Sequence, residues 1–261
     1  MSRGGAFESI EILSVAGTQR SPTLLKDTPH VTTANDAFRS VLEKSDRLSS
    51  ALANLESAKA QYCVFGGWLR DTLAPHTQAS PPPRDVDLVV ADVDIAALVD
   101  LLPSDVRPTI FGGIQSSAPP VPFDIWPLHE TFLIRTLKLP TSFVSLLQTT
   151  DFDINAALYF PAQGGRAPRI LEAGMLSALI AKQISFNASH LPFPVLQCAR
   201  LAAYAAKLEF SFSPPVLDFM RMILASSNHL KEVVAGLERY HKGPMAEKAI
   251  DIVTSIVEGR I

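Results

Sequence analysis

The sequence of this 261-residue chain predicts an α+β fold followed by a helical region. Val64–Asp71 is typical of a strand that stops at two glycines and opens directly into a helix. Arg84–Val90 is typical of a strand that carries two acidic side chains two residues apart. From Ala173 onward the pattern is helical. We therefore predict three parts: an N-terminal arm over residues 1–32, an α+β domain over 33–170 and a helical region over 171–261.

The remaining elements follow from hydrophobic spacing. The arm is rich in Ser, Thr, Gly and Pro, and its one apolar piece, Ile10–Val15, favours a single strand. Apolar residues at near-helical spacing predict a helix from about Ala34, with Thr33 or Asn35 as its N-cap. The other predicted strands are Tyr62–Phe65, Arg107–Phe111 and Val121–Leu128, and the other predicted helices are Trp68–Leu73, Val93–Leu102, Pro215–Ala225, His229–Tyr240 and Met245–Val257.

The acidic pair predicts a metal. Because side chains alternate along a strand, Asp85 and Asp87 share one face, while Val86, Leu88 and Val90 share the other. Two carboxylates on one face repel each other, so we expect a cation between them. Mg²⁺ is the usual one, since it prefers carboxylate oxygens and shares its remaining positions with phosphates.

The glycine pair predicts a phosphate contact. Gly66 and Gly67 would let the backbone approach a phosphate closely, and a helix that opens near Trp68 would offer free N–H groups. Taken alone, a Gly-Gly pair before a helix is usually an ordinary turn, and Asp-x-Asp is often a solvated strand end. Their occurrence together, in this order, favours a nucleotide site.

This combination resembles the head domain of tRNA nucleotidyltransferases and bacterial poly(A) polymerases, within the DNA polymerase β-like superfamily. The matching residues are Gly66, Gly67, Arg70, Asp71, Asp85 and Asp87. The resemblance covers about residues 45 to 215. It implies a mixed sheet with helices, followed by an all-helical neck and C-terminal region. It also implies a nucleoside triphosphate (NTP) substrate with Mg²⁺ or Mn²⁺.

Two arginines flank the predicted site. Arg70 lies just inside the predicted helix, where it could bind a triphosphate or pair with Asp71 to stiffen the loop. These two roles are left open. The segment Pro75–Pro83, with three consecutive prolines, excludes regular structure there. In the resembled family this loop is shorter and basic, and here only Arg84 remains beside the acidic pair.

Asp124 is the third candidate carboxylate. In the predicted strand Val121–Leu128, Phe123 and Ile125 point one way, and Asp124 and Trp126 point the other way. Polymerase β-like folds place an acid on a strand adjacent to the Asp-x-Asp strand. The resemblance thus makes Asp124 a candidate metal ligand or general base. The alternative is a surface acid on an edge strand.

A second motif, Thr149–Ala157, resembles the family pattern Arg-Arg-Asp-Phe-Thr-Ile-Asn-Ala. Asp151 and Asn155 match and are candidates for holding the ribose, with capping of the following segment as the alternative. Thr149 and Thr150 replace the two arginines, which should weaken triphosphate binding by a few kcal/mol, taking about 1.5–3 kcal/mol for each charge-assisted hydrogen bond.

A third motif, Phe193–Phe210, resembles the family's neck helix. Arg200 matches one of its arginines and is a candidate nucleotide contact. Phe193 and Pro194 stand in place of the acidic pair, and Gln197 in place of the first arginine. In CCA-adding enzymes the Asp of that pair and the replaced arginine read the Watson–Crick edge of the incoming base, and neither is present here. The resemblance therefore does not predict the family's templated choice of C and A.

Composition limits the partners. The formal net charge is −3, whereas proteins that grip long nucleic acid nonspecifically are usually basic. Any RNA contact should therefore come from a local patch. The two cysteines, Cys63 and Cys198, lack the spacing of metal ligands or of a disulfide framework. No apolar run approaches about 20 residues. We expect a cytoplasmic protein with no membrane partner and no disulfide-linked partner.

The predicted activity is metal-dependent transfer of a nucleoside monophosphate from an NTP to an acceptor hydroxyl, with release of pyrophosphate. The resemblance favours an RNA 3′ end, such as that of a tRNA, as acceptor. One alternative is nucleotidylation of a protein or small molecule. Another is a non-catalytic descendant of the fold that binds nucleotide or RNA. The intact acids argue against that last alternative, and Thr149, Thr150 and Gln197 argue for it.

Overall fold

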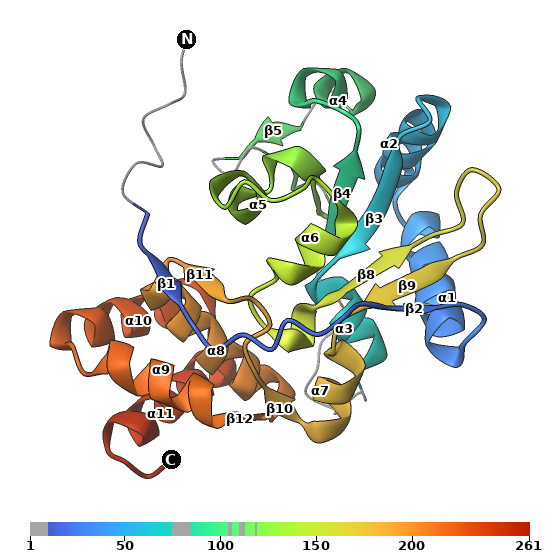
Figure 1. The fold of residues 1–261 in the computed structure, drawn as a ribbon. Helices are drawn as coiled ribbons and strands as arrows, with labels where there is room; N and C mark the ends of the chain where they lie inside the picture. The colour runs from blue at the N-terminus through green and yellow to red at the C-terminus, as the bar shows by residue number, and fades with distance from the viewer. Residues whose placement is uncertain (1–9, 75–84, 104–105, 110–112, 118) are drawn as a thin grey trace. The chain divides into compact units, whose positions relative to one another are not determined.

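A computed structural model describes residues 10–74, 85–103, 106–109, 113–117 and 119–261. The chain forms two compact units that do not follow its order (Figure 1). One unit consists of Arg20–Thr150 and Ile154–Leu176, and we call it the sheet unit. The other contains Asp151–Asp153, Ser177–Ile261 and the segment that ends at Gln19, and we call it the helical unit.

An eight-stranded mixed sheet organises the sheet unit. Its strand order is β2-β9-β8-β3-β4-β7-β6-β5. β4 and β7 are parallel, and every other neighbouring pair is antiparallel. The strands are β2 (Thr23–Leu25), β3 (Gln61–Phe65), β4 (Val86–Ala91), β5 (Arg107–Pro108), β6 (Ile114–Ser116), β7 (Phe123–Pro127), β8 (Ala157–Phe160) and β9 (Arg169–Glu172).

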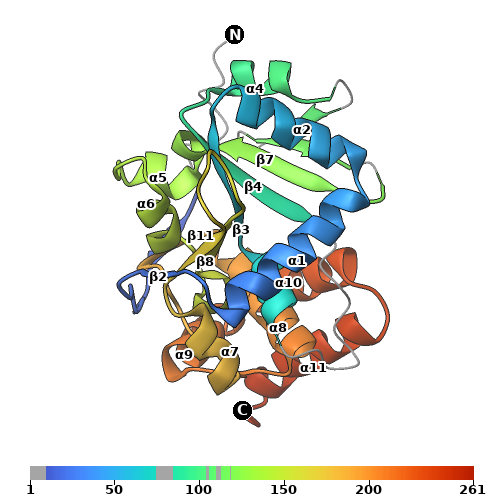
Figure 2. The ribbon, with the colours of Figure 1, turned by 90° about the vertical axis from the view of Figure 1, so that its right-hand side faces the viewer.

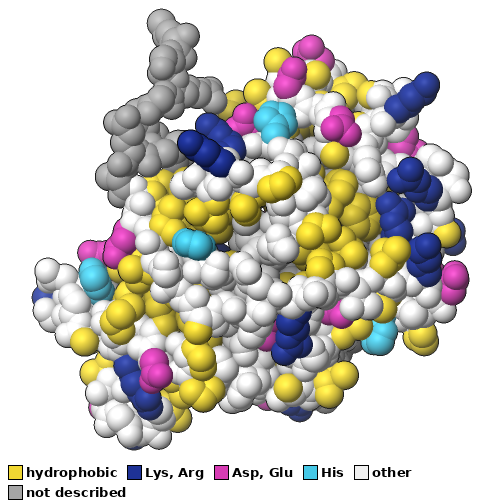
Figure 3. Space-filling model, viewed as in Figure 1, with side chains coloured by type: hydrophobic (Ala, Val, Ile, Leu, Met, Phe, Trp, Pro, Cys, Tyr) yellow, Lys and Arg dark blue, Asp and Glu magenta, His cyan; other side chains and the backbone are white. Residues whose placement is uncertain are grey.

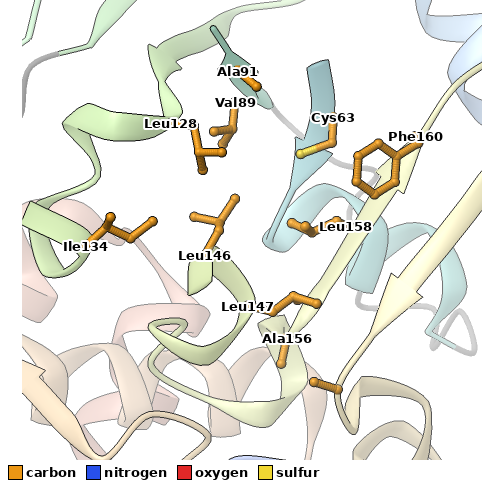
Figure 4. Close-up of a cluster of buried hydrophobic side chains, with 11 residues drawn as sticks. Cys63, Val89, Ala91, Leu128, Ile134, Leu146, Leu147, Ala156, Leu158 and Phe160 are labelled. Carbon is orange, nitrogen blue, oxygen red and sulfur yellow. The ribbon is translucent and has the colours of Figure 1, made fainter. Parts of the chain in front are cut away.

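Helices cover both faces of this sheet. The unit contains α1 (Pro29–Glu43), α2 (Asp46–Ser57), α3 (Gly67–Leu73), α4 (Ile95–Leu101), α5 (Phe132–Thr136) and α6 (Phe143–Gln148), with the 3₁₀ turn η1 (Leu128–Glu130). A second 3₁₀ turn, η2 (Asp153–Asn155), begins at the boundary between the two units. On one face Cys63 and Val89 meet Ile134 of α5 and Leu146 of α6 in a buried apolar cluster (Figure 4). The interior is therefore made from alternating strand residues and short helices.

The opposite face packs on α1 and α3. Phe38 of α1 makes edge-to-face contacts with Trp68 and Tyr159, whose ring centroids lie 5.7 and 5.6 Å away. Figure 2 shows α1 and α2 in front of the strands on this side. The predicted caps are wrong: Thr28 caps α1 and Ser45 caps α2, whereas Thr33 and Asn35 lie inside α1. Pro29 at the first helical position explains this earlier start, because proline lacks the N–H that would be unsatisfied there.

The helical unit is built around α8 (Pro194–Leu208), which packs on α9 (Pro214–Leu224), α10 (Ser227–Tyr240) and α11 (Pro244–Val257). These helices agree with the sequence prediction within one or two residues. The region after residue 170 is not all-helical, however. Besides α7 (Met175–Ala181) and the end of β9, it contains β10 (Gln183–Ile184), β11 (His190–Pro192) and β12 (Ser211–Phe212).

The N-terminal segment supplies a strand to each unit. β1 (Ile12–Ser14) pairs with β11 in the helical unit, and β2 pairs with β9 at the edge of the sheet. Two pieces of the segment predicted as a loose arm, β1 and β2, are thus held by backbone hydrogen bonds. Among the described residues, no helix is both long and apolar enough to cross a bilayer. Cys63 and Cys198 are buried free thiols.

Candidate active site

Two of the three candidate carboxylates lie side by side on the sheet. Asp87 of β4 and Asp124 of β7 are register partners in parallel strands, and such neighbours lie about 5 Å apart. Phe65 of β3 pairs with Asp87 on one side, and Gln115 of β6 pairs with Asp124 on the other. Asp85 is exposed and directly precedes β4. The expected adjacency of the two strands is therefore present, with both acids on one face.

The electrostatics link Asp85 to this pair. Partial burial raises the pKa of Asp124 above its ordinary value, and the Asp85 carboxylate raises it further. A hydrogen bond from Gln115 acts in the opposite direction. A carboxylate that feels a second negative charge holds its proton more tightly, because ionisation would place two like charges close together. The raised pKa makes Asp124 a suitable group to accept a proton.

The donor set suits a divalent cation, although it is not gathered into a closed site. Within the described residues, no group of three or more His, Cys, Asp or Glu side chains could as arranged hold a metal ion. Asp124 is nevertheless coupled to Asp87 by register and to Asp85 by charge. All three offer the oxygen ligands that Mg²⁺ and Mn²⁺ prefer, and a bound cation would offset their mutual repulsion.

The glycine turn between β3 and α3 has an open side and a braced side. Gly66 has φ +70° and ψ −127°, a conformation that residues with a Cβ rarely adopt, and a Cβ there would meet nothing within 4 Å. At Gly67 a Cβ would lie 3.2 Å from Nη2 of Arg70. A ligand can therefore approach the Gly66 side, whereas the Arg70 guanidinium fills the other. With only seven residues, α3 adds little dipole of its own.

Arg70 braces this turn from the inside. Its guanidinium donates from Nε to Asp71 Oδ1 at 2.8 Å and from Nη1 to Asn155 Oδ1 at 2.6 Å. The Arg70 side chain is 4% exposed and the Asp71 side chain 9%. The geometry favours loop bracing over phosphate contact for Arg70. It gives Asp71 and Asn155 the same role, since both hold the guanidinium in place.

Asp151 and Arg200 lie together in the helical unit. The Arg200 guanidinium donates to the Asp151 carboxylate, to Gln197 Oε1 at 3.0 Å and to the Tyr204 hydroxyl at 2.9 Å. The Asp151 carboxylate also accepts from the backbone N–H of Phe152 at 2.8 Å. These contacts commit the Asp151 carboxylate within the helical unit. Gln197 is buried and donates to Pro192 O, so its amide is committed within the unit.

The two threonines that replace the family's arginines end α6. The hydroxyls of Thr149 and Thr150 both donate to Leu146 O at 3.0 Å. Neither supplies a cation. Arg84, the remaining candidate, lies outside the described residues.

Sequence reasoning missed Gln115. Ile114 and Ser116 are buried and Gln115 is exposed, which is the alternation of a strand. The sequence itself does not alternate in this way, since Gln115 and Ser116 are both polar, and it gives no local signal for a strand after Gly113. It could not have predicted the partner strand, because pairing across a sheet is not encoded locally.

The chain has the fold of tRNA nucleotidyltransferases, in agreement with the sequence prediction, because solved structures of that class match it. One is a tRNA nucleotidyltransferase complexed with a primer tRNA and an incoming ATP analogue, with 18% identity, 80% of this chain and 63% of that chain covered, and a TM-score of 0.59. A CCA-adding enzyme in complex with ATP is 14% identical, with 89% of this chain and 55% of that chain covered and a TM-score of 0.60. The Thermotoga maritima CCA-adding enzyme complexed with tRNA is 15% identical, with 89% of this chain and 54% of that chain covered and a TM-score of 0.58.

The match is one of fold. The chain spans less than two thirds of the length of each of these three proteins. No known family profile matches the sequence. No curated protein sequence matches it either.

Proposed function

We propose that this protein is a metal-dependent nucleotidyltransferase that moves a nucleoside monophosphate from an NTP to an acceptor hydroxyl. The observation that carries the proposal is the parallel register of Asp87 and Asp124, with Asp85 close enough to raise the pKa of Asp124. This arrangement occurs on a fold similar to proteins solved with ATP, CTP and tRNA. The open side of Gly66 supports approach of the triphosphate.

In the proposed reaction, the acceptor oxygen forms a bond to the α-phosphorus and the bond to pyrophosphate breaks. The Asp124 carboxylate takes the proton of the acceptor hydroxyl, a role favoured by its raised pKa. Asp85 and Asp87, with Asp124, would hold Mg²⁺ or Mn²⁺, which would neutralise charge on the phosphates. Arg70 keeps the glycine turn in shape through Asp71 and Asn155.

The proposed acceptor is an RNA 3′ end, and its support is the tRNA bound in similar structures. Because Gln197 and Arg200 hold each other in the helical unit, we do not assign them the reading of a base. Nucleotidylation of a protein or small molecule is the second candidate. A cytoplasmic location remains part of the proposal, supported by two buried free thiols.

The direct test is a labelling survey. The protein is incubated with total RNA and each α-labelled NTP, with Mg²⁺ or Mn²⁺, and the products are separated on denaturing gels. We expect label in RNA. Label in protein bands alone would favour the second candidate. If no NTP gave transfer with either metal, the enzymatic proposal would be rejected and a non-catalytic binding role, supported by Thr149 and Thr150, would replace it.

A further inference from the structure

A basic groove lies at the far edge of the sheet. Its volume is about 340 Å³. The groove is lined by Leu24, Lys26, Asp27, Arg166, Ala167, Pro168 and Arg169. Three cations thus face one carboxylate in a chain whose net charge is −3. Within the part of the chain that the structure describes, no ion pair engages any of these three cations.

The sheet fixes two of the cations. β2 and β9 pair as far as Leu25 and Ile170; Lys26 directly follows β2, and Arg169 is the first residue of β9. Arg169 is half-buried, and its guanidinium carbon lies 4.5 Å above the ring centroid of Phe160. Burial and the neighbouring charge of Arg166 both lower the pKa of Arg169, so these like charges are held close to each other. A bound anion would offset the repulsion between these two positive charges.

A tight hairpin fixes the third cation. Gln163 and Arg166 exchange two backbone hydrogen bonds of 3.1 and 3.0 Å around Gly164 and Gly165, which have φ +55° and +73°. Positive φ at both central residues is the geometry of a two-residue hairpin turn, and glycine adopts it without strain. The Gln163 side chain also accepts from Tyr62 N and donates to Ala60 O. The hairpin is therefore anchored to β3, and Arg166 is presented from a rigid support.

The groove lies on the same face of the sheet as the candidate active site. Arg169 pairs with Phe160, and Phe160 belongs to the apolar cluster of Cys63 and Val89. Asp87 lies two residues before Val89 on that face. β9 is three strands from β4, which corresponds to about 14 Å across the sheet. Figure 3 shows Lys and Arg side chains gathered over the β8–β9 hairpin along this edge.

We propose that Lys26, Arg166 and Arg169 form a binding site for the phosphate backbone of an RNA strand. The inference rests on the proposed function for the identity of the strand, which is the acceptor whose 3′ end is extended. The groove supplies the local positive patch that a chain of negative net charge needs for RNA contact. The three cations share the lining of this groove with the apolar residues Leu24 and Pro168.

The test is RNA binding without NTP, so that it does not depend on turnover. The variant K26Q/R166Q removes two exposed cations and leaves the half-buried Arg169 in place. The control R39Q/K44Q removes two exposed cations within or directly after α1, which packs on the opposite face of the sheet. Each double variant lowers the formal net charge of −3 by two. Affinity for a short labelled single-stranded RNA is measured by fluorescence anisotropy over a salt series, and folding by circular dichroism.

We expect K26Q/R166Q to weaken RNA binding about tenfold and to reduce the slope of log K against log salt by about 1.4, or about 0.7 for each phosphate contact. The control should bind like the wild type. If both variants lost RNA affinity equally, or if neither lost any, the proposed RNA-binding site would be wrong. A second arm uses inorganic tripolyphosphate as competitor: if K26Q/R166Q weakened only tripolyphosphate binding, the site would serve free polyphosphate and the RNA assignment would be wrong. If RNA binding depended on the groove but no nucleotide were transferred, the proposed enzymatic activity would be rejected and the proposed RNA-binding site would stand.

Discussion

Asp87 and Asp124 are register partners on the only two parallel neighbours of the described sheet, β4 and β7. In a parallel pair, the partners of one row point to the same face, so the two carboxylates cannot avoid each other by alternation. Their separation in sequence hides this proximity. The proximity of these two carboxylates is a direct physical reason for placing the proposed metal site at Asp87 and Asp124.

The first prediction concerns the acids themselves. The double variant D85N/D87N should lose labelled-nucleotide transfer by on the order of 10²-fold or more, because it removes two oxygen ligands of the proposed metal. Its melting temperature should stay near that of the wild type, since like-charge repulsion is relieved. Transfer and thermal unfolding are measured on the same preparation. Undiminished transfer in the double variant would exclude these residues as metal ligands.

A second prediction uses the raised pKa of Asp124. Since the folded state holds this proton more tightly than the unfolded chain, Asp124 contributes stability that is present below its unfolded pKa of about 3.9 and lost as pH rises through its folded pKa. The free energy of unfolding of D124N should therefore fall less over this range than that of the wild type. Urea denaturation with chelator present, at a series of pH values, measures the difference. Parallel profiles for the two proteins would contradict the assignment.

A third prediction concerns the brace under the glycine turn. R70K keeps the charge but cannot reach both Asp71 and Asn155 with the planar geometry of a guanidinium. We expect a loss of about 3 kcal/mol in the free energy of unfolding, as for other buried pairs that lose a partner. Denaturant unfolding measures it. Nucleotide transfer should fall as well, because the turn loses its support. Wild-type stability in R70K would show that the brace is not needed.

The fourth prediction separates backbone strain from crowding. At both Gly66 and Gly236 an added Cβ would meet nothing within 4 Å, but only Gly66 has positive φ. G66A should therefore destabilise the protein by about 1–3 kcal/mol. G236A, inside α10, should stabilise it by up to about 1 kcal/mol, because alanine is the better helix former. Melting curves of both variants test the opposite signs. A G66A variant as stable as the wild type, or more stable, would indicate that the conformation of Gly66 is not constrained.

Much of the site was predictable because its signals are local. The glycines at the end of β3 and the alternation of Phe123, Asp124 and Ile125 each depend on a few neighbouring residues. The resemblance then supplied the order in which such pieces are joined. The helices of the C-terminal region were equally accessible, because each carries a long amphipathic pattern.

The rest depended on contacts between distant parts of the chain. β8 is buried along its whole length, so it shows no alternation, and β9 is only four residues long and directly follows Pro168. β2 pairs with a strand more than a hundred residues away, which no local pattern reveals. α5 and α6 are too short to show a helical period. The choice between phosphate contact and bracing for Arg70 likewise needed the position of Asn155.

The strands of the N-terminal segment have a practical consequence for anyone preparing this protein. Trimming the chain to begin at α1 would strip one strand from β11 and another from β9, leaving unpaired backbone N–H and C=O groups at both edges. Bare edges of this kind recruit strands from other molecules. A shortened version should therefore aggregate or exchange segments between copies, and affinity tags are better attached at the other end.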